Sequence, residues 1–88
     1  MEESKPVIQF PCDFPLKVIG HNADDFESFV VEIVRRHVPE LDAAVVNTKP
    51  SSGGKYLSVS MKFIADSREQ MDALYEELSR HDRVVWIL

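Results

Sequence analysis

The chain has 88 residues, enough for one small domain, and a formal net charge of −5. This acidic balance argues against general binding to phosphate backbones, which requires clustered Lys and Arg, so nucleic acid is not expected as a partner. The sequence has no apolar run of the roughly 20 residues that cross a bilayer, and no signal-peptide pattern. Its single cysteine, Cys12, excludes an internal disulfide. These features predict a cytoplasmic protein without a membrane segment.

Residues 1–12 are expected to form an extended or frayed lead-in, because charged residues open the chain and Pro11 interrupts the apolar run that follows. Residues 13–88 are predicted to form a single domain. Its first strand is predicted over 13–20, where apolar and other residues alternate with a period of two.

The next segment carries apolar residues at spacings of three and four, which predicts an amphipathic helix. Asn22, Asp24 and Asp25 are each suited to cap its start. Pro39 is expected to stop the helix at about Val38.

The second half of the chain repeats this pattern with an extra strand. A weak alternation predicts a strand over 43–49, and the clearest period-two alternation in the chain predicts another over 56–65. A second helix is predicted to begin at Asp66 and Ser67, because Ser67 and Gln70 form a capping-box pattern.

The last strand is predicted over 84–88, an apolar segment without alternation. We expect Val84, Trp86 and Leu88 to face the helices, because this set contains the largest side chain to bury.

The order strand, helix, strand, strand, helix, strand predicts an α+β fold, the ferredoxin-like βαββαβ sandwich. Its four-stranded antiparallel sheet would carry both helices on one face and leave the other face open. The predicted strands place an uneven mixture of polar and apolar residues on that open face: Lys17, Ile19, Val45, Asn47, Ser58, Ser60, Lys62, Ile64, Val85 and Ile87. Exposed apolar patches mark partner surfaces, so we expect a protein partner or a homodimer there, with Lys17, Ser58, Ser60, Lys62 and Ile87 as candidate contacts.

Two loops could bind a small ligand. Ser51-Ser52-Gly53-Gly54-Lys55 places glycines before a lysine, but a strand follows it where a P-loop requires a helix. A hairpin turn is the favoured interpretation, with an anion contact as the alternative. Gly20, His21 and Asn22 form a turn into the first helix, and the alternative is contact with a small metabolite at the helix N-terminus.

No catalytic or metal site is predicted. His21, His37 and His81 lack metal-ligand spacing, Cys12 has no cysteine partner, and no nucleophile has a recognisable base beside it. We therefore expect no cofactor, no metal and no enzymatic activity. Acylphosphatases, which share the predicted fold, need an arginine in the first strand–helix loop, where this chain has His21-Asn22.

Three segments resemble the YbeD-like family of small bacterial proteins: Phe10-Pro11-Cys12-Asp13-Phe14-Pro15-Leu16-Lys17-Val18-Ile19-Gly20, Lys49-Pro50-Ser51-Ser52-Gly53-Gly54-Lys55-Tyr56-Leu57-Ser58-Val59-Ser60, and Leu74-Tyr75-Glu76-Glu77-Leu78 with the apolar strand that follows it. The resemblance covers nearly the whole chain from about Ile8. It implies a ferredoxin-like fold similar to the ACT regulatory domains of amino-acid metabolism, and it carries over no catalytic residues.

These observations favour a small cytoplasmic regulatory or binding module that acts through a protein partner, a small metabolite or both. A homo-oligomeric interaction unit without a ligand is the alternative. An enzyme with an unrecognised site is the third hypothesis.

Overall fold

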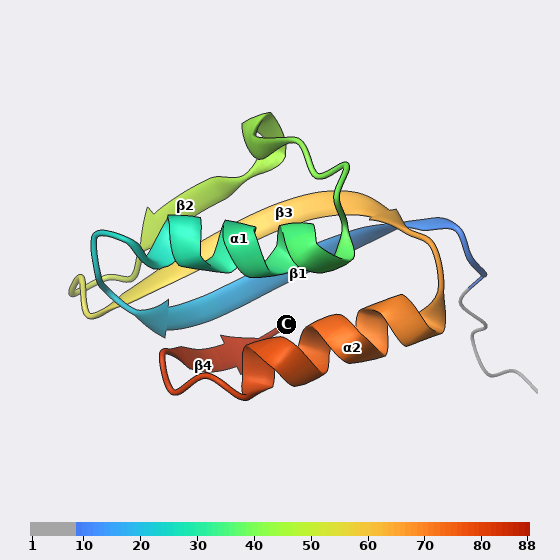
Figure 1. Cartoon of the computed structure of the whole chain (residues 1–88). Helices are drawn as coiled ribbons and strands as arrows, with labels where there is room; N and C mark the ends of the chain where they lie inside the picture. The colour runs from blue at the N-terminus through green and yellow to red at the C-terminus, as the bar shows by residue number, and fades with distance from the viewer. Residues whose placement is uncertain (1–8) are drawn as a thin grey trace, which may run out of the picture.

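The computed structural model describes residues 9–88 as a sheet with two helices packed against one of its faces (Figure 1). All neighbouring strands are antiparallel, in the order β2-β3-β1-β4. This arrangement confirms the ferredoxin-like α+β fold. The elements follow in the order β1 (Cys12–His21), α1 (Phe26–His37), a 3-10 turn η1 (Ala43–Val45), β2 (Asn47–Pro50), β3 (Tyr56–Ala65), α2 (Arg68–Ser79) and β4 (Val84–Ile87).

The predicted lead-in over 1–12 falls largely outside the described residues. The described part shows that β1 begins at Cys12, one residue before the predicted strand.

The two central strands, β1 and β3, pair over their full length, from Cys12 opposite Ala65 to His21 opposite Tyr56. Their alternation places one set of side chains under the helices, as the period-two pattern predicts. The core lies between this face and the apolar stripes of α1 and α2. Its buried residues are Leu16, Val18, Phe26, Val30, Ile33, Val34, Val38, Leu41, Val59, Met61, Phe63, Ala65, Met71, Leu74 and Leu78.

The helices begin differently. The Ser67 hydroxyl accepts a 3.1 Å hydrogen bond from the Gln70 amide, so the predicted cap of α2 by Ser67 is confirmed. The Gln70 side chain accepts a 2.7 Å hydrogen bond from the Asp66 amide, one residue before the Ser67 amide that a capping box would use. The residue at the N-cap of α1 is Asp25, whose side chain makes no capping bond. Asn22, the first of the three predicted caps, instead bonds to the β2–β3 turn.

The prediction of a strand over 43–49 is wrong in its first half. Residues 43–45 form a 3-10 turn, and β2 covers only Asn47–Pro50. Asp42 explains the difference: its carboxylate accepts a 2.9 Å hydrogen bond from the Ala44 amide, and its carbonyl accepts one from the Val45 amide. These local bonds offer the backbone an alternative to the sheet ladder.

The predicted orientation of the last strand is also wrong. Val84 lies opposite Gly20, but Trp86 lies opposite Ile19 and Ile87 opposite Val18, so the register shifts by one residue within β4. A bulge of this kind reverses the alternation beyond it. Val84 and Ile87 therefore pack against the core, whereas Trp86 points to the open face and is 61% exposed.

Candidate functional site: the open face of the sheet

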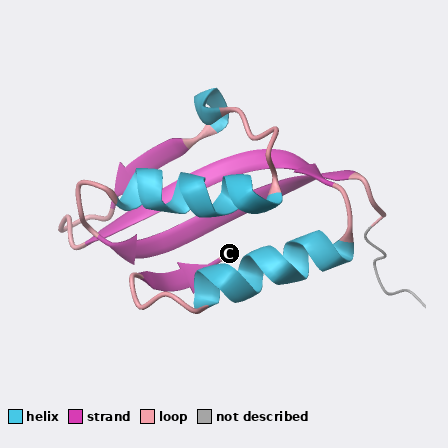
Figure 2. Ribbon diagram, in the orientation of Figure 1, coloured by secondary structure: helices cyan, strands magenta, loops and turns pink. Residues whose placement is uncertain are grey.

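The face of the sheet opposite the helices is the candidate functional surface. Both α1 and α2 lie on the same side of the strands, so neither of them covers this open face (Figure 2). The strand register arranges its side chains in rows across the sheet. One row runs through Lys49, Ser58, Ile19 and Trp86, and the next through Asn47, Ser60, Lys17 and Leu88.

Four of the predicted contact residues lie together on this face. Lys17 is paired with Ser60, Ser58 lies opposite Ile19, and Lys62 lies opposite Pro15. The fifth residue, Ile87, does not belong to this group. It lies opposite the buried Val18 and packs against the core, because the bulge in β4 exchanges its position with that of Trp86.

Trp86 is the main residue that sequence reasoning missed. Its indole is 61% exposed beside Ile19, and the neighbouring Leu88 is 64% exposed. Lys17 and Leu88 exchange backbone hydrogen bonds of 3.2 and 2.8 Å, so the chain beyond β4 stays paired with the centre of β1. An apolar corner formed by Ile19, Trp86 and Leu88 therefore lies directly beside the Lys17 side chain. The only sequence signal for it is the absence of alternation in 84–88.

The open face also carries a pair of aromatic rings at the end where β1 meets the first loop. His21 and Tyr56 are cross-strand neighbours with ring centroids 5.6 Å apart. The Lys55 ammonium lies 5.8 Å from the centre of the Tyr56 ring. His21 is exposed here, so it belongs to the open face and is separated from Gly20 and Asn22, with which it was grouped in sequence.

Gly20 and Asn22 have structural roles in the first strand–helix loop. A Cβ on Gly20 would lie 2.3 Å from the Arg83 carbonyl oxygen and 2.3 Å from the Phe26 ring, so the helix packs directly on the glycine backbone. The Asn22 side chain donates a 2.7 Å hydrogen bond to the Gly54 carbonyl, and its backbone amide donates to the Lys55 carbonyl. These contacts favour the turn interpretation over a metabolite site.

The loop from Ser51 to Lys55 is a hairpin turn. The Ser51 amide donates to the Tyr56 carbonyl and the Gly54 amide donates to the Ser51 carbonyl, each at 2.8 Å. Gly53 and Gly54 have φ values of 138° and 71°, which favour glycine. Because these two amides bond within the turn, the geometry supports the hairpin interpretation rather than an anion cradle.

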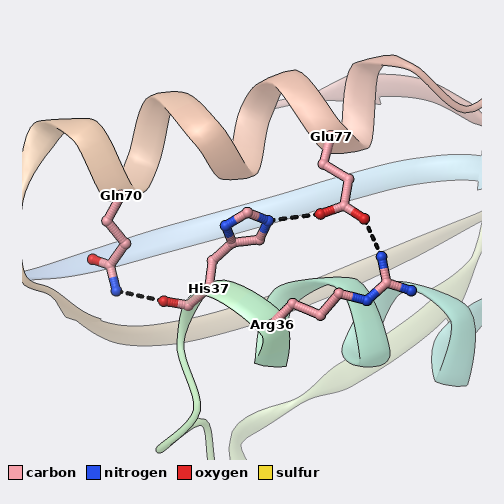
Figure 3. A network of polar contacts seen from close by, with 4 residues as sticks. All are labelled: Arg36, His37, Gln70 and Glu77. Atoms are coloured by element: carbon pink, nitrogen blue, oxygen red, sulfur yellow. Dashed lines mark hydrogen bonds and ion pairs between the residues drawn. The ribbon is translucent and has the colours of Figure 1, made fainter.

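A polar network joins the ends of the two helices away from the open face (Figure 3). Glu77 on α2 accepts hydrogen bonds from Arg36 and from His37, the latter at 2.7 Å. Gln70 donates a 2.7 Å hydrogen bond to the His37 carbonyl, which satisfies one carbonyl at the end of α1. The hydrogen bond from His37, followed by the charge of Arg36, lowers the pKa of Glu77. These contacts hold α1 against α2.

A second set of contacts holds the start of α1. The Arg83 guanidinium donates two hydrogen bonds to the Asp25 carboxylate, the shorter of 2.6 Å, and lies 4.4 Å from the centre of the Phe29 ring. This pairing lowers the pKa of Asp25. A carboxylate at the helix start competes with any incoming anion, which further weakens a ligand site in this loop.

One shallow hollow lies at the opposite end of the sheet. It has a volume of about 410 Å³, an apolar lining that includes Leu41 and Phe63, and carboxylates at Glu40, Asp42 and Asp66. Within residues 9–88, no cluster of three or more His, Cys, Asp or Glu could hold a metal. No helix in that same range is long and apolar enough to cross a membrane.

The comparisons with known proteins agree with this fold. A UPF0250 protein of Hahella chejuensis is 42% identical over 99% of this chain and 96% of its own, and one of Neisseria gonorrhoeae is 39% identical over the same shares. Among solved structures, HP0495 of H. pylori matches with a TM-score of 0.77 and 22% identity, over 99% of this chain and 91% of that one. The ACT domain of a GTP pyrophosphokinase from Chlorobium tepidum matches with a TM-score of 0.64 and 8% identity, over 86% of this chain and 84% of that one.

The two structural matches show the fold alone. The family itself is shown by sequence, because a model described as "Protein of unknown function (DUF493)" matches residues 5–88. The chain therefore belongs to the DUF493 family, which confirms the YbeD-like resemblance of its sequence.

Proposed function

We propose that this protein is a small cytoplasmic, non-enzymatic module that regulates a protein partner by binding it through the open face of the sheet. The observation that carries the proposal is the apolar corner beside the polar centre of the sheet, in which Trp86 and Leu88 are exposed and Ile19 is half-buried. Tryptophan is enriched among the residues that contribute most to protein interfaces, and exposed apolar patches mark interaction surfaces.

The ligand loop is the weaker alternative. Gly20 has no space for even a Cβ atom, and Asn22 is bonded to the hairpin. The other polar clusters, around Glu77 and Arg83, link one helix to the rest of the protein and do not converge on the open face. The ACT-like fold is consistent with a regulatory role, and the docking proposal itself depends on the surface residues.

The test is photocrosslinking in cells that express the protein. A photoreactive phenylalanine analogue replaces Ser60 at the centre of the open face, or Glu76 on the exposed side of α2 as the matched control. We expect a discrete adduct of higher mass from position 60 and none from position 76. Adding Trp86→Ala to the Ser60 variant should strongly reduce the adduct.

Three outcomes would contradict this proposal. The absence of an adduct at position 60, or equal adducts at both positions, would exclude specific docking on the open face. An adduct of twice the monomer mass would show the homo-oligomeric alternative instead.

A further inference from the structure

The charges of this protein are divided unequally between its strands and the segments that contain its helices. The four strands and the β2–β3 turn, residues 12–21, 47–65 and 84–88, contain four lysines (Lys17, Lys49, Lys55 and Lys62) and one carboxylate, that of Asp13. The segments 22–46 and 66–83, which contain both helices, carry twelve carboxylates against five arginines. The net charge of −5 therefore combines a positive charge on the strands with a larger negative charge on the segments that contain the helices.

One lysine lies beside the apolar corner, and the others lie farther across the same sheet. Lys17 lies between Ser60 and Leu88, and Lys49 lies in the row that ends at Trp86. Lys62 lies farther along β3, opposite Pro15, where it lines the hollow that also contains Glu40, Asp42 and Asp66. Asp13 lies in the next row of β1, opposite Ile64. Among residues 9–88 the ion pairs are made by Arg36, His37 and Arg83, all on the helical side.

This distribution argues against a second copy of the chain as the occupant. A symmetric dimer through the open face would bring the lysines of one copy toward those of the other, and like charges across an interface are unfavourable. The acidic helical layer of a second copy would be complementary in charge to the open face. In that head-to-tail contact, however, one copy keeps its open face free and the other keeps its helical layer free. Such a contact either closes into a ring of several copies or grows into an open chain, and it does not give a simple symmetric dimer.

We propose that the occupant of the open face is an acidic segment of another protein, with apolar residues over Ile19 and Trp86 and carboxylates near Lys17, Lys49 and Lys62. This inference rests on the proposed docking function and names the chemistry of the partner. Charge complementarity increases the association rate and selects against wrong partners, while the apolar corner supplies most of the binding energy. Single-stranded nucleic acid fits less well, because the open face holds few cations and the rest of the molecule repels phosphates.

The protein contains one tryptophan, so the fluorescence of Trp86 reports binding at this face directly. The probes are a short peptide of alternating glutamate and leucine, the same peptide with lysine in place of glutamate, and oligothymidine. We expect the glutamate peptide to change the Trp86 emission saturably, and its affinity to fall as salt is raised. The lysine peptide and oligothymidine should bind at least about tenfold more weakly, a difference of about 1.4 kcal/mol.

Two triple variants with the same net charge show whether the affinity depends on the lysines of the open face or on the total charge of the protein. Lys17→Glu/Lys49→Glu/Lys62→Glu reverses the charge of these lysines, and Arg35→Glu/Arg68→Glu/Arg80→Glu makes the same change on the exposed side of the helices. The first should lose at least about tenfold in affinity for the glutamate peptide and the second less than about threefold. If the reversed charge prevents folding, the Lys→Gln version of the triple variant and the salt dependence of the unmodified protein provide the same test.

Tighter binding of oligothymidine, equal binding of both peptides, equal losses in the two triple variants, or no binding of the glutamate peptide would overturn the acidic-partner inference. If the crosslink at position 60 persists in any of these cases, docking through the open face stands and only the partner chemistry is wrong. If that crosslink is absent, the proposed function itself fails.

Discussion

The close approach at Gly20 makes a quantitative prediction for the substitution Gly20→Ala. The added Cβ would meet the Arg83 carbonyl oxygen and the Phe26 ring, each at 2.3 Å. Neither neighbour can yield easily, because the carbonyl is backbone that accepts a hydrogen bond from the His21 amide and Phe26 is fully buried.

Overpacking a well-packed site costs about 1–3 kcal/mol, and the fixed neighbours place Gly20→Ala at the upper end. Alanine recovers about 0.5–1 kcal/mol by restricting the unfolded chain. The net loss in the free energy of unfolding should be about 2 kcal/mol. For a domain of this size that loss lowers Tm by roughly 8–16 °C.

Urea unfolding followed by far-UV circular dichroism measures the loss. The control is Gly54→Asn, because Gly54 has open space around its Cβ position and a φ of 71°, which asparagine tolerates. This variant should lose about 1 kcal/mol or less. A loss below about 0.5 kcal/mol for Gly20→Ala, or an equal loss in both variants, would refute the role assigned to the close approach.

Three further predictions concern stability. In urea unfolding, Ile87→Ala should lower the free energy of unfolding by about 2 kcal/mol and Trp86→Ala by less than about 1 kcal/mol, because only Ile87 packs on the core. A larger loss for Trp86→Ala than for Ile87→Ala would contradict the bulge in β4. Glu77→Gln should destabilise the protein near neutral pH, and the difference from the unmodified protein should shrink as pH falls below 4.5, the ordinary pKa of this carboxyl, because its folded-state pKa is lowered by His37 and Arg36. A difference that grows with acid in pH-dependent thermal unfolding would disprove this sign. Ser67→Ala should cost about 1 kcal/mol by removing the cap of α2, and an unchanged midpoint in the same urea assay would argue against that cap.

The candidate site was only partly predictable. Lys17, Ser58, Ser60 and Lys62 were placed correctly, because they lie on two long strands with a regular alternation. Trp86 and Ile87 were exchanged, since every residue in 84–88 is apolar and no pattern distinguishes the two faces. Gly20, His21 and Asn22 are adjacent in sequence, but the structure gives them three separate surroundings: the Phe26 ring, the Tyr56 ring and the hairpin.

The order of the helices and strands and the fold class follow from the sequence. Periodicity and capping are local properties, so the alternation in β3 and the Ser67 cap need no knowledge of distant residues. The register of β4 against β1 is known only from the folded chain, and it places the bulge and brings Trp86 to the open face beside Ile19. That register depends on how strands distant in sequence pack against one core. Because of it, the apolar residues at the end of the sequence form an apolar corner beside Lys17 on the open face.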